Sequence, residues 1–282
     1  MHFQPMTKLL AKAADGGYAV PHFNVFNLET VKNSIDVAEE LQSPVIFGIH
    51  EVEAKYAGIT NLVNIIRTAG EGRSVEASIH LDHGGSFDLV MKTIHAGFDS
   101  VMFDGSTIPL EDNVRTTKDV VKAAHAAGLS VEAEVGTIGN TLEYGGEIEN
   151  PHLADPESAA LVAATGIDAL AVAIGNAHGV YIEEPSLDFA LLEKIRDRVG
   201  IPLVLHGGSG IPDDQVQRAI SLGIAKVNIS TVLRTRFVDA TRVTLDGNTG
   251  HVDFMDLLDA GAAAMKEELR RSVHLVMSAG RS

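Results

Sequence analysis

Short β-branched runs alternate with longer helical patterns along almost the whole chain, and this alternation predicts a closed, parallel (β/α)8 barrel. The length of 282 residues suits one such barrel, and an apolar content of 45% can bury one large core. We therefore expect a single domain over residues 1–282. The alternative, an open doubly wound sheet, would place a glycine-rich dinucleotide or phosphate loop after an early strand, and the chain has none.

Eight runs predict strands because they are rich in apolar and β-branched residues and most end near Gly, Pro, Asp or Asn. These runs are Tyr18–Phe23, Pro44–Gly48, Val75–Leu81, Ser100–Asp104, Ser130–Glu134, Ala169–Ile174, Leu203–His206 and Lys226–Ile229. Between them the sequence has helical periodicity, most clearly over Leu28–Leu41, Phe87–Ala96, Leu110–Ala127 and Leu187–Val199.

Two segments depart from a minimal repeat. Val135–Asp155 is a long connection after the fifth strand, rich in Gly, Asn and Glu, and loops of this length are usually lids or disordered segments. Val252–Val276 has helical periodicity beyond the eight-fold count and predicts an extra C-terminal helix used for packing or subunit contact.

Composition excludes several classes of function. The chain has no Cys, which rules out disulfides, thiolate nucleophiles and Cys-ligated metals and suits a reducing cytoplasm. A net charge of −16 argues against a nucleic-acid partner, which requires a basic face. No run of eighteen apolar residues indicates a membrane span, and the N-terminus lacks the regions of a signal peptide. We therefore expect a cytoplasmic protein without nucleic-acid or membrane partners.

Three histidines fall at the ends of predicted strands. His83 ends the third, His178 lies just beyond the sixth, and His206 ends the seventh. Barrel enzymes build their active sites at these carboxyl ends, and a catalytic metal needs about three protein ligands and an open position. An all-nitrogen set favours zinc, although cobalt or manganese also fits. Because side chains alternate along a strand, we expect His80 to face away from His83.

Asp82 precedes one of these histidines, where a carboxylate can act as a general acid and base; its alternative role is to orient a histidine. Glycine- and hydroxyl-rich segments follow the seventh and eighth strands, where barrels commonly bind phosphate through backbone N–H groups. Their candidate residues are Gly207, Gly208, Ser209, Asn228, Ile229, Ser230 and Thr231. Because the net charge would repel an anion at long range, phosphate binding would depend on these local groups.

Six motifs together resemble the class II fructose/tagatose-bisphosphate aldolases over nearly the whole chain. They are YAVPHFN (18–24), LDHG (81–84), VEAEVG (131–136), AIGNAHG (173–179), VLHGGSG (204–210) and KVNIST (226–231). The resemblance implies a TIM barrel and a lyase that reversibly cleaves a ketose 1-phosphate, such as a ketose 1,6-bisphosphate, into dihydroxyacetone phosphate and an aldehyde. It also implies a homodimer or homotetramer.

By the same resemblance, the three strand-end histidines would bind Zn²⁺, and Asp82 would move the proton of the C4 hydroxyl. Asp104 and Glu134 would hold a displaced or second metal ion, or serve as acids behind the ligands. Gly179, with the two segments after strands seven and eight, would bind dihydroxyacetone phosphate, and Asn24 belongs to the same substrate site. A monovalent cation such as Na⁺ or K⁺ is a further expected cofactor. The aldolase strategy that uses a Schiff base is disfavoured because Lys226 precedes the end of its strand.

The family's mobile loop usually supplies a glutamate that exchanges the C3 proton. The pattern differs here, and Glu143 is our candidate, with Glu147 and Glu149 behind it; solvated loop charges are the alternative reading.

Other departures concern the far end of the substrate. Segment 250–253 lacks the Arg that clamps a distal phosphate in the family, and Ile182 stands where many members have Lys, while His50 and Arg234 remain. A sulfonate carries one negative charge against nearly two for a phosphate, so fewer cations would suffice. We therefore weigh as an alternative 6-deoxy-6-sulfofructose 1-phosphate, which would yield sulfolactaldehyde, or a neutral terminus.

Two other classes of function compete. A metal-dependent barrel hydrolase would typically carry a His-x-His pair on its first strand, where this chain has only His22. A non-catalytic scaffold would be expected to have lost Asp82 or a metal-binding histidine, and all four are present.

Overall fold

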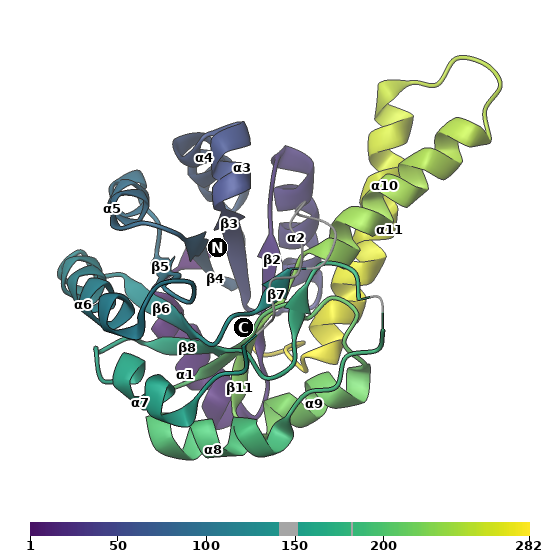
Figure 1. Ribbon diagram of the computed structural model, residues 1–282. Helices are drawn as coiled ribbons and strands as arrows, with labels where there is room; N and C mark the ends of the chain where they lie inside the picture. Colours follow the sequence, from purple (N-terminus) through teal and green to yellow (C-terminus); the bar gives the residue numbers. More distant parts are fainter. Residues whose placement is uncertain (141–151, 182) are drawn as a thin grey trace.

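The computed structural model describes residues 1–140, 152–181 and 183–282, and its parallel strands close into a barrel surrounded by helices (Figure 1). The sheet order is β1-β4-β3-β2-β11-β10-β8-β6-β5, and the pairing of β5 with β4 closes the ring. The barrel strands are β2 (Val20–Asn24), β3 (Val45–His50), β4 (Glu76–Gly84), β5 (Ser100–Phe103), β6 (Ser130–Val135), β8 (Ala169–Val172), β10 (Leu203–Leu205) and β11 (Ile224–Ile229). The short β1 (His2–Phe3) is an extra partner of β4.

Helices follow the barrel strands as predicted, and one further helix, α1, precedes the first of them. They are α1 (Met6–Gly16), α2 (Leu28–Glu40), α3 (Glu51–Ala57), α4 (Ile59–Ala69), α5 (Phe87–Ala96), α6 (Leu110–Ala126), α7 (Pro156–Ala163), α8 (Phe189–Val199), α9 (Asp213–Ser221), α10 (Thr231–Asp246) and α11 (Phe254–Leu275). Each of the eight predicted strands overlaps a barrel strand, and α11 confirms the extra C-terminal helix. The described part of the long connection contains β7 (Gly139–Asn140), which pairs in parallel with β9 (Ala177–His178).

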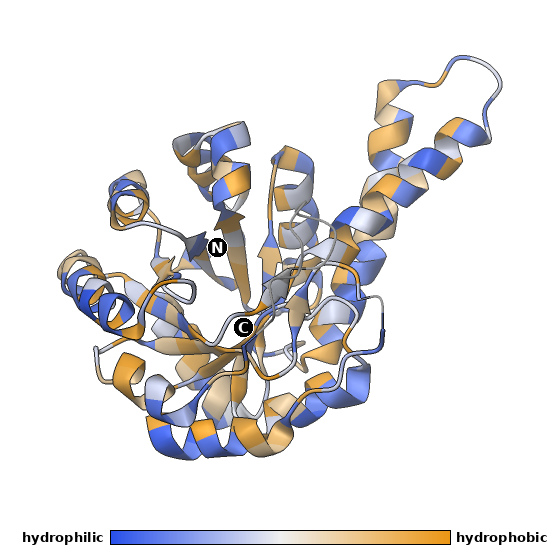
Figure 2. Cartoon of the chain, in the orientation of Figure 1, coloured by the Kyte–Doolittle hydropathy of each residue, from blue (hydrophilic) through white to orange (hydrophobic). Residues whose placement is uncertain are grey.

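Two apolar clusters hold the barrel together. The larger lies between the strands and the helices, so that the strands are largely hydrophobic and the outer helix faces hydrophilic (Figure 2). The smaller lies inside the barrel, where Met6, Leu9 and Leu10 of α1 pack against strand residues such as Val20 and Ile46. Burial of each such side chain contributes about 1.5–3 kcal/mol, so α1 is a stabilising plug. Because α1 fills this part of the barrel interior, a cavity can form only at the other end, where the strands have their carboxyl ends.

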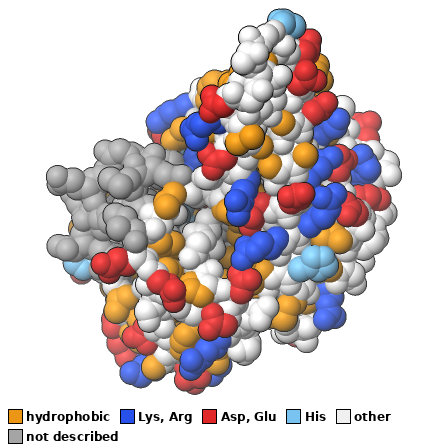
Figure 3. Space-filling view, turned by 90° about the vertical axis from the view of Figure 1, so that its right-hand side faces the viewer, with side chains coloured by type: hydrophobic (Ala, Val, Ile, Leu, Met, Phe, Trp, Pro, Cys, Tyr) orange, Lys and Arg blue, Asp and Glu red, His pale blue; other side chains and the backbone are white. Residues whose placement is uncertain are grey.

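Helices α10 and α11 pack against each other and project from the barrel as an arm (Figure 1). Side chains exposed on this arm include Val243, which is 71% exposed, and Phe254, which is 69% exposed. Seen from this side, the surface mixes acidic and basic side chains with scattered apolar ones (Figure 3). Among the described residues, no helix is long and apolar enough to cross a membrane.

Candidate functional site

A cavity opens at the carboxyl ends of the barrel strands, where the sequence places its functional residues. Its lining comes from the ends of β2, β3, β4, β5, β6, β9, β10 and β11 or the loops that follow them. The lining residues are Asn24, His50, Val52, Asp82, His83, Asp104, Ser106, Thr107, Glu134, Thr137, Ile138, His178, Gly179, Gly207, Ser209, Asn228, Ser230 and Thr231. Residues from most of the barrel strands thus share one concave site.

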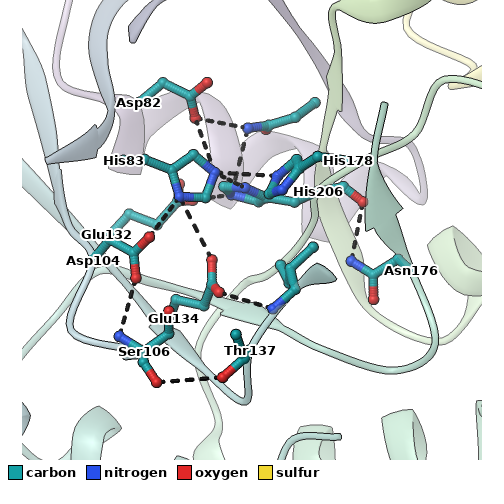
Figure 4. Close-up of polar contacts among 12 residues, drawn as sticks. Asp82, His83, Asp104, Ser106, Glu132, Glu134, Thr137, Asn176, His178 and His206 are labelled. Atoms are coloured by element: carbon teal, nitrogen blue, oxygen red, sulfur yellow. Dashed lines mark hydrogen bonds and ion pairs between the residues drawn. The ribbon is translucent and has the colours of Figure 1, made fainter. Parts of the chain in front are cut away.

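Three histidine rings converge here: His83 and His178 line the cavity, and His206 is fully buried beside them (Figure 4). His83 Nε2 lies 2.9 Å from His206 Nδ1 and 3.2 Å from His178 Nε2. Tetrahedral zinc with Zn–N bonds of 2.0–2.1 Å separates its ligand nitrogens by about 3.3 Å, so these three rings nearly match a metal's requirement. Burial lowers the pKa values of His178 and His206, which favours the neutral rings that bind metals. The chemistry and spacing of the donors therefore fit a divalent cation.

A local backbone feature turns His83 into the site. His83 has a φ of +52°, and the pairing of β4 with β5 shifts register between Leu81 and Gly84. The expectation that His80 and His83 face opposite ways is therefore wrong. His80 lies inside the barrel, 3.6 Å from Glu132 Oε2, and the left-handed residue brings His83 to the same inner side. Regular alternation fails where a strand ends in this conformation.

Two acids lie behind His83. Asp104 Oδ2 lies 2.8 Å from His83 Nδ1, and Glu134 Oε2 lies 3.8 Å from the same atom. Burial opposes protonation of His83, but the hydrogen bond to Asp104 and the nearby carboxylates raise its pKa to about 10. A metal would therefore displace a proton from His83. His83, Asp104 and Glu134 also form a second group of potential metal ligands, so the geometry fits both predicted roles of the two acids.

Glu132 is a functional residue that sequence reasoning missed. It is fully buried, and its Oε1 lies 2.8 Å from His206 Nε2, while its Oε2 accepts a hydrogen bond from Lys226 Nζ at 2.7 Å. This contact places the ring proton of His206 on Nε2 and turns Nδ1 toward the other histidines. The signal was the alternation in VEAE, which puts Glu132 on the same strand face as Glu134. Lys226, paired in the interior, is not at the strand end that a Schiff base needs.

Asp82 is held by two amides. Asn24 Nδ2 donates to Asp82 Oδ2 at 2.8 Å, and Asn228 Nδ2 donates to Oδ1 at 3.1 Å. Burial alone would raise the pKa of Asp82, but the surrounding imidazoles and the Lys226 ammonium hold it well below its usual range. Its Oδ1 lies 4.0 Å from His83 Nε2, so an ionised carboxylate lies beside the converging ring nitrogens.

A further part of the cavity lining comes from glycine- and serine-containing loops, which can offer backbone N–H groups. Gly179, Gly207 and Ser209 come from the loops after β9 and β10, and Ser230 precedes α10, whose N-terminus begins at Thr231. The Ser230 hydroxyl is buried without a hydrogen-bond partner among the described residues. A helix N-terminus with nearby glycines and hydroxyls is suited to bind an anion.

The structure does not bring every predicted residue to the cavity surface. His206, Gly208 and Ile229 are not among its lining residues; His206 is fully buried, and the side chain of Ile229 lies in the outer apolar cluster. Arg234 also lies outside the lining, with its guanidinium 5.6 Å from the ring centre of Phe26. Glu143, Glu147, Glu149 and Ile182 lie outside the described residues.

Comparison with known proteins gives consistent matches. Residues 4–281 match the family model described as fructose-bisphosphate aldolase class-II. The chain is 46% identical over 270 residues to the fructose-bisphosphate aldolase of Geobacillus stearothermophilus, covering 94% of each chain. It is 41% identical over 269 residues to the D-tagatose-1,6-bisphosphate aldolase subunit GatY of Klebsiella oxytoca, covering 95% of each. The crystal structure of the YdjI aldolase of Escherichia coli K12 superimposes with a TM-score of 0.85 at 36% identity and 99% coverage of both chains.

Proposed function

The chain belongs to the class-II fructose-bisphosphate aldolase family, and from that premise we propose that it is a zinc-dependent lyase that reversibly cleaves a ketose 1-phosphate to dihydroxyacetone phosphate and an aldehyde. Membership makes the protein an aldolase of a metal-dependent family. The relatives' names specify fructose and tagatose bisphosphates. In this chain, the glycines and hydroxyls of the cavity lining support binding of the C1 phosphate more directly than binding of a second phosphate.

One observation carries the proposal: the ring nitrogens of His83, His178 and His206 converge beside a cavity that is lined by the first two and by an ionised Asp82. A divalent cation bound by these nitrogens would act as a Lewis acid toward substrate oxygens. Asp82 would accept the C4 hydroxyl proton during cleavage and return it during addition. Its two amide partners fix the carboxylate for this transfer.

The remaining walls would position the substrate. The Gly207–Ser209 loop and the N-terminus of α10 would hold the C1 phosphate through N–H groups and hydroxyls. Glu143 stays our sequence-based candidate for exchange of the C3 proton, and a monovalent cation such as Na⁺ or K⁺ stays an expected cofactor.

The direct test uses purified protein, stripped with EDTA and reloaded with Zn²⁺, Co²⁺ or Mn²⁺. We expect release of dihydroxyacetone phosphate from ketose 1-phosphates only after metal is restored, and highest activity with zinc. Metal content and turnover are measured on the same sample. Release of inorganic phosphate without dihydroxyacetone phosphate would instead indicate a hydrolase, and chelator-insensitive cleavage would reject the metal site.

We also propose that the protein is a homodimer or homotetramer. Exposed Val243, Phe254 and Met255 near the end of the α10–α11 arm support this, because a soluble monomer rarely leaves such groups uncovered together. Sedimentation equilibrium should give a mass of two or four times 29.9 kDa. Replacement of Val243 and Phe254 by Ser should reduce that mass; a monomeric parent protein would contradict the proposal.

A further inference from the structure

The order of strands in the barrel divides the cavity into two halves. The proposed phosphate wall follows β10, β11 and, through β9, β8, whereas β3 and β5 lie across the ring and β6 is next to β5. A ketose whose C1 phosphate binds the first wall, and whose reacting carbons lie beside the histidines, must extend its remaining carbons toward the second. The residues of that second wall therefore select the far end of the substrate.

The second wall offers neutral hydrogen-bonding groups. Ser106 and Thr107 follow β5, Thr137 follows β6, and His50 ends β3. His50 Nδ1 accepts a hydrogen bond from the N–H of Val52 at 3.2 Å. A ring nitrogen that accepts carries no proton, so the imidazole is the neutral tautomer with its proton on Nε2. Hydroxyls and a neutral imidazole are suited to bind sugar hydroxyls.

The charges around this wall are unfavourable to an anion. The cavity lining includes the carboxyl groups of Asp82, Asp104 and Glu134, and no Lys or Arg among the described residues. Close behind the wall is a further acid, Glu53, whose Oε2 lies 3.7 Å from His50 Nδ1. Arg234, the cation that the sequence suggested for this end, lies outside the lining, over Phe26, and its charge lowers the pKa of Glu53, so these two charges offset each other.

The segments outside this lining do not change the balance. Residues 141–151 contain three Glu and no Lys or Arg in their sequence, so they cannot provide a cation wherever they lie. The stretch 243–265, which includes the end of the α10–α11 arm, also lacks Lys and Arg. A second phosphate would bring nearly two negative charges close to the Asp82 and Asp104 carboxylates, and the described lining has no Lys or Arg to pair them.

We propose that the aldehyde half of the substrate is uncharged: the preferred ketose carries one phosphate, at C1, and ends in a hydroxylated carbon chain. This proposal rests on the aldolase function proposed above and specifies its substrate class. It separates the protein from the bisphosphate activities named for its relatives, and it favours the neutral terminus over the sulfonate as the alternative raised by the sequence.

The test uses zinc-loaded protein and three substrates that differ at C6: D-fructose 1-phosphate, D-fructose 1,6-bisphosphate and 6-deoxy-6-sulfofructose 1-phosphate. Each is also assayed as its C4 epimer. We expect kcat/KM for the hydroxyl terminus to exceed that for the phosphate terminus by about tenfold or more, because the extra charge stays unpaired. The sulfonate should fall between them. A higher kcat/KM for the phosphate or the sulfonate overturns the inference.

A charge-introducing variant makes the cause testable. Thr107 is exposed at the rim of the second wall, so Thr107→Lys should fold and should raise kcat/KM for the bisphosphate relative to the monophosphate by about tenfold. Tyr56→Lys is the matched control, because Tyr56 is 83% exposed on α3 and does not line the cavity. An equal change in both variants, or none in Thr107→Lys, would count against a local charge effect.

The two levels of proposal fail differently. If no ketose 1-phosphate with any terminus yields dihydroxyacetone phosphate, the aldolase function itself is wrong. If cleavage occurs and an anionic terminus is preferred, only the inference about the far end is wrong.

Discussion

Asp82 and Glu134 line the same cavity, yet their surroundings shift their pKa values in opposite directions. Burial raises the pKa of Glu134 well above its usual range, and the negative charge of the neighbouring Asp104 raises it further. Asp82 is equally buried, but imidazoles, Lys226 and two amide donors favour its charged form. At the residue scale, the site therefore separates one ionised carboxylate suited to accept a proton from one that tends to hold its proton.

Asp82→Asn removes the proton acceptor while keeping the shape of the side chain. We expect kcat to fall about 10²- to 10⁴-fold, the range for loss of general acid–base catalysis, with little change in bound zinc. Steady-state kinetics and metal analysis of the same preparation check this. In Asp82→Asn the new amide would face the donor groups of Asn24 and Asn228, which could disturb the site by itself, so Asp82→Ala serves as a second variant. Loss of zinc from both variants would point to the alternative role of Asp82, the orientation of a histidine.

In the proposed metal site Glu132 is a positioning residue, since it contacts the candidate ligand His206 rather than the substrate. Glu132→Gln should weaken zinc affinity about 10- to 100-fold, because His206 loses the carboxylate that orients it. Competition with a chromophoric chelator measures that affinity. The variant also leaves Lys226 without its carboxylate, so Lys226→Met and the double variant separate the destabilising effect of an unpaired ammonium from the effect on the metal.

At the element scale, the loops after β8 and β10 carry two of the three converging histidines and are tied to each other by hydrogen bonds. The Tyr181 hydroxyl accepts from the N–H of Ala177 at 2.8 Å and donates to the carbonyl of Gly207 at 3.1 Å. Asn176 Nδ2 adds a bond to the carbonyl of His206 at 3.0 Å. These bonds fix the separation of His178 from His206, which a metal ion needs.

Gly207 permits this close approach of the two loops. It has a φ of +64°, and a Cβ there would overlap the carbonyl oxygen of Ala177. We expect Gly207→Ala to lower zinc content and activity at least tenfold, because the backbone must move a ligand loop. Gly72→Ala is the matched control, since Gly72 has a φ of +73° with open space around it. Equal losses in both variants would show that backbone strain alone is responsible.

At the scale of the whole molecule, buried ionisable groups set the pH range of the metal-free protein's stability. Interaction with Lys226 and His206 outweighs burial and depresses the pKa of Glu132 below its ordinary value of 4.5. Its contribution is therefore present above pH 4.5 and is lost as the pH falls below it. The pKa of Glu134 is raised, so this residue favours the folded state more when it is protonated. Its contribution to stability therefore changes with pH in the opposite direction to that of Glu132.

Burial raises the pKa of Tyr181 from 10.0 to about 12. An unfolded chain would ionise this phenol first, so stability should fall as the pH rises from 10 toward 12. Urea denaturation of the metal-free protein across pH should give a broad maximum with loss at both ends. Tyr181→Phe should weaken the alkaline loss, and an unchanged alkaline profile in that variant would contradict the assignment.

The sequence by itself determined the architecture of this protein and most of its site. Eight β-branched runs with helices between them fix a parallel barrel, because that pattern buries every strand on both faces. Once the barrel is known, His83, His178 and His206 are expected at the same rim, because parallel strands end there. The sequence pattern was enough to predict the position of a residue wherever that position depends only on its place along a strand.

Only the tertiary structure decided the details that depend on contacts between distant segments. The positive φ of His83 reverses the alternation expected from the strand, and no local pattern announced it. Glu132 shows its role only when β6, β10 and β11 are side by side, because its partners His206 and Lys226 are 74 and 94 residues away in sequence. The position of Arg234 outside the cavity is likewise a result of packing. Charge balance in a site is a sum over neighbours in space, and the folded chain alone defines those neighbours.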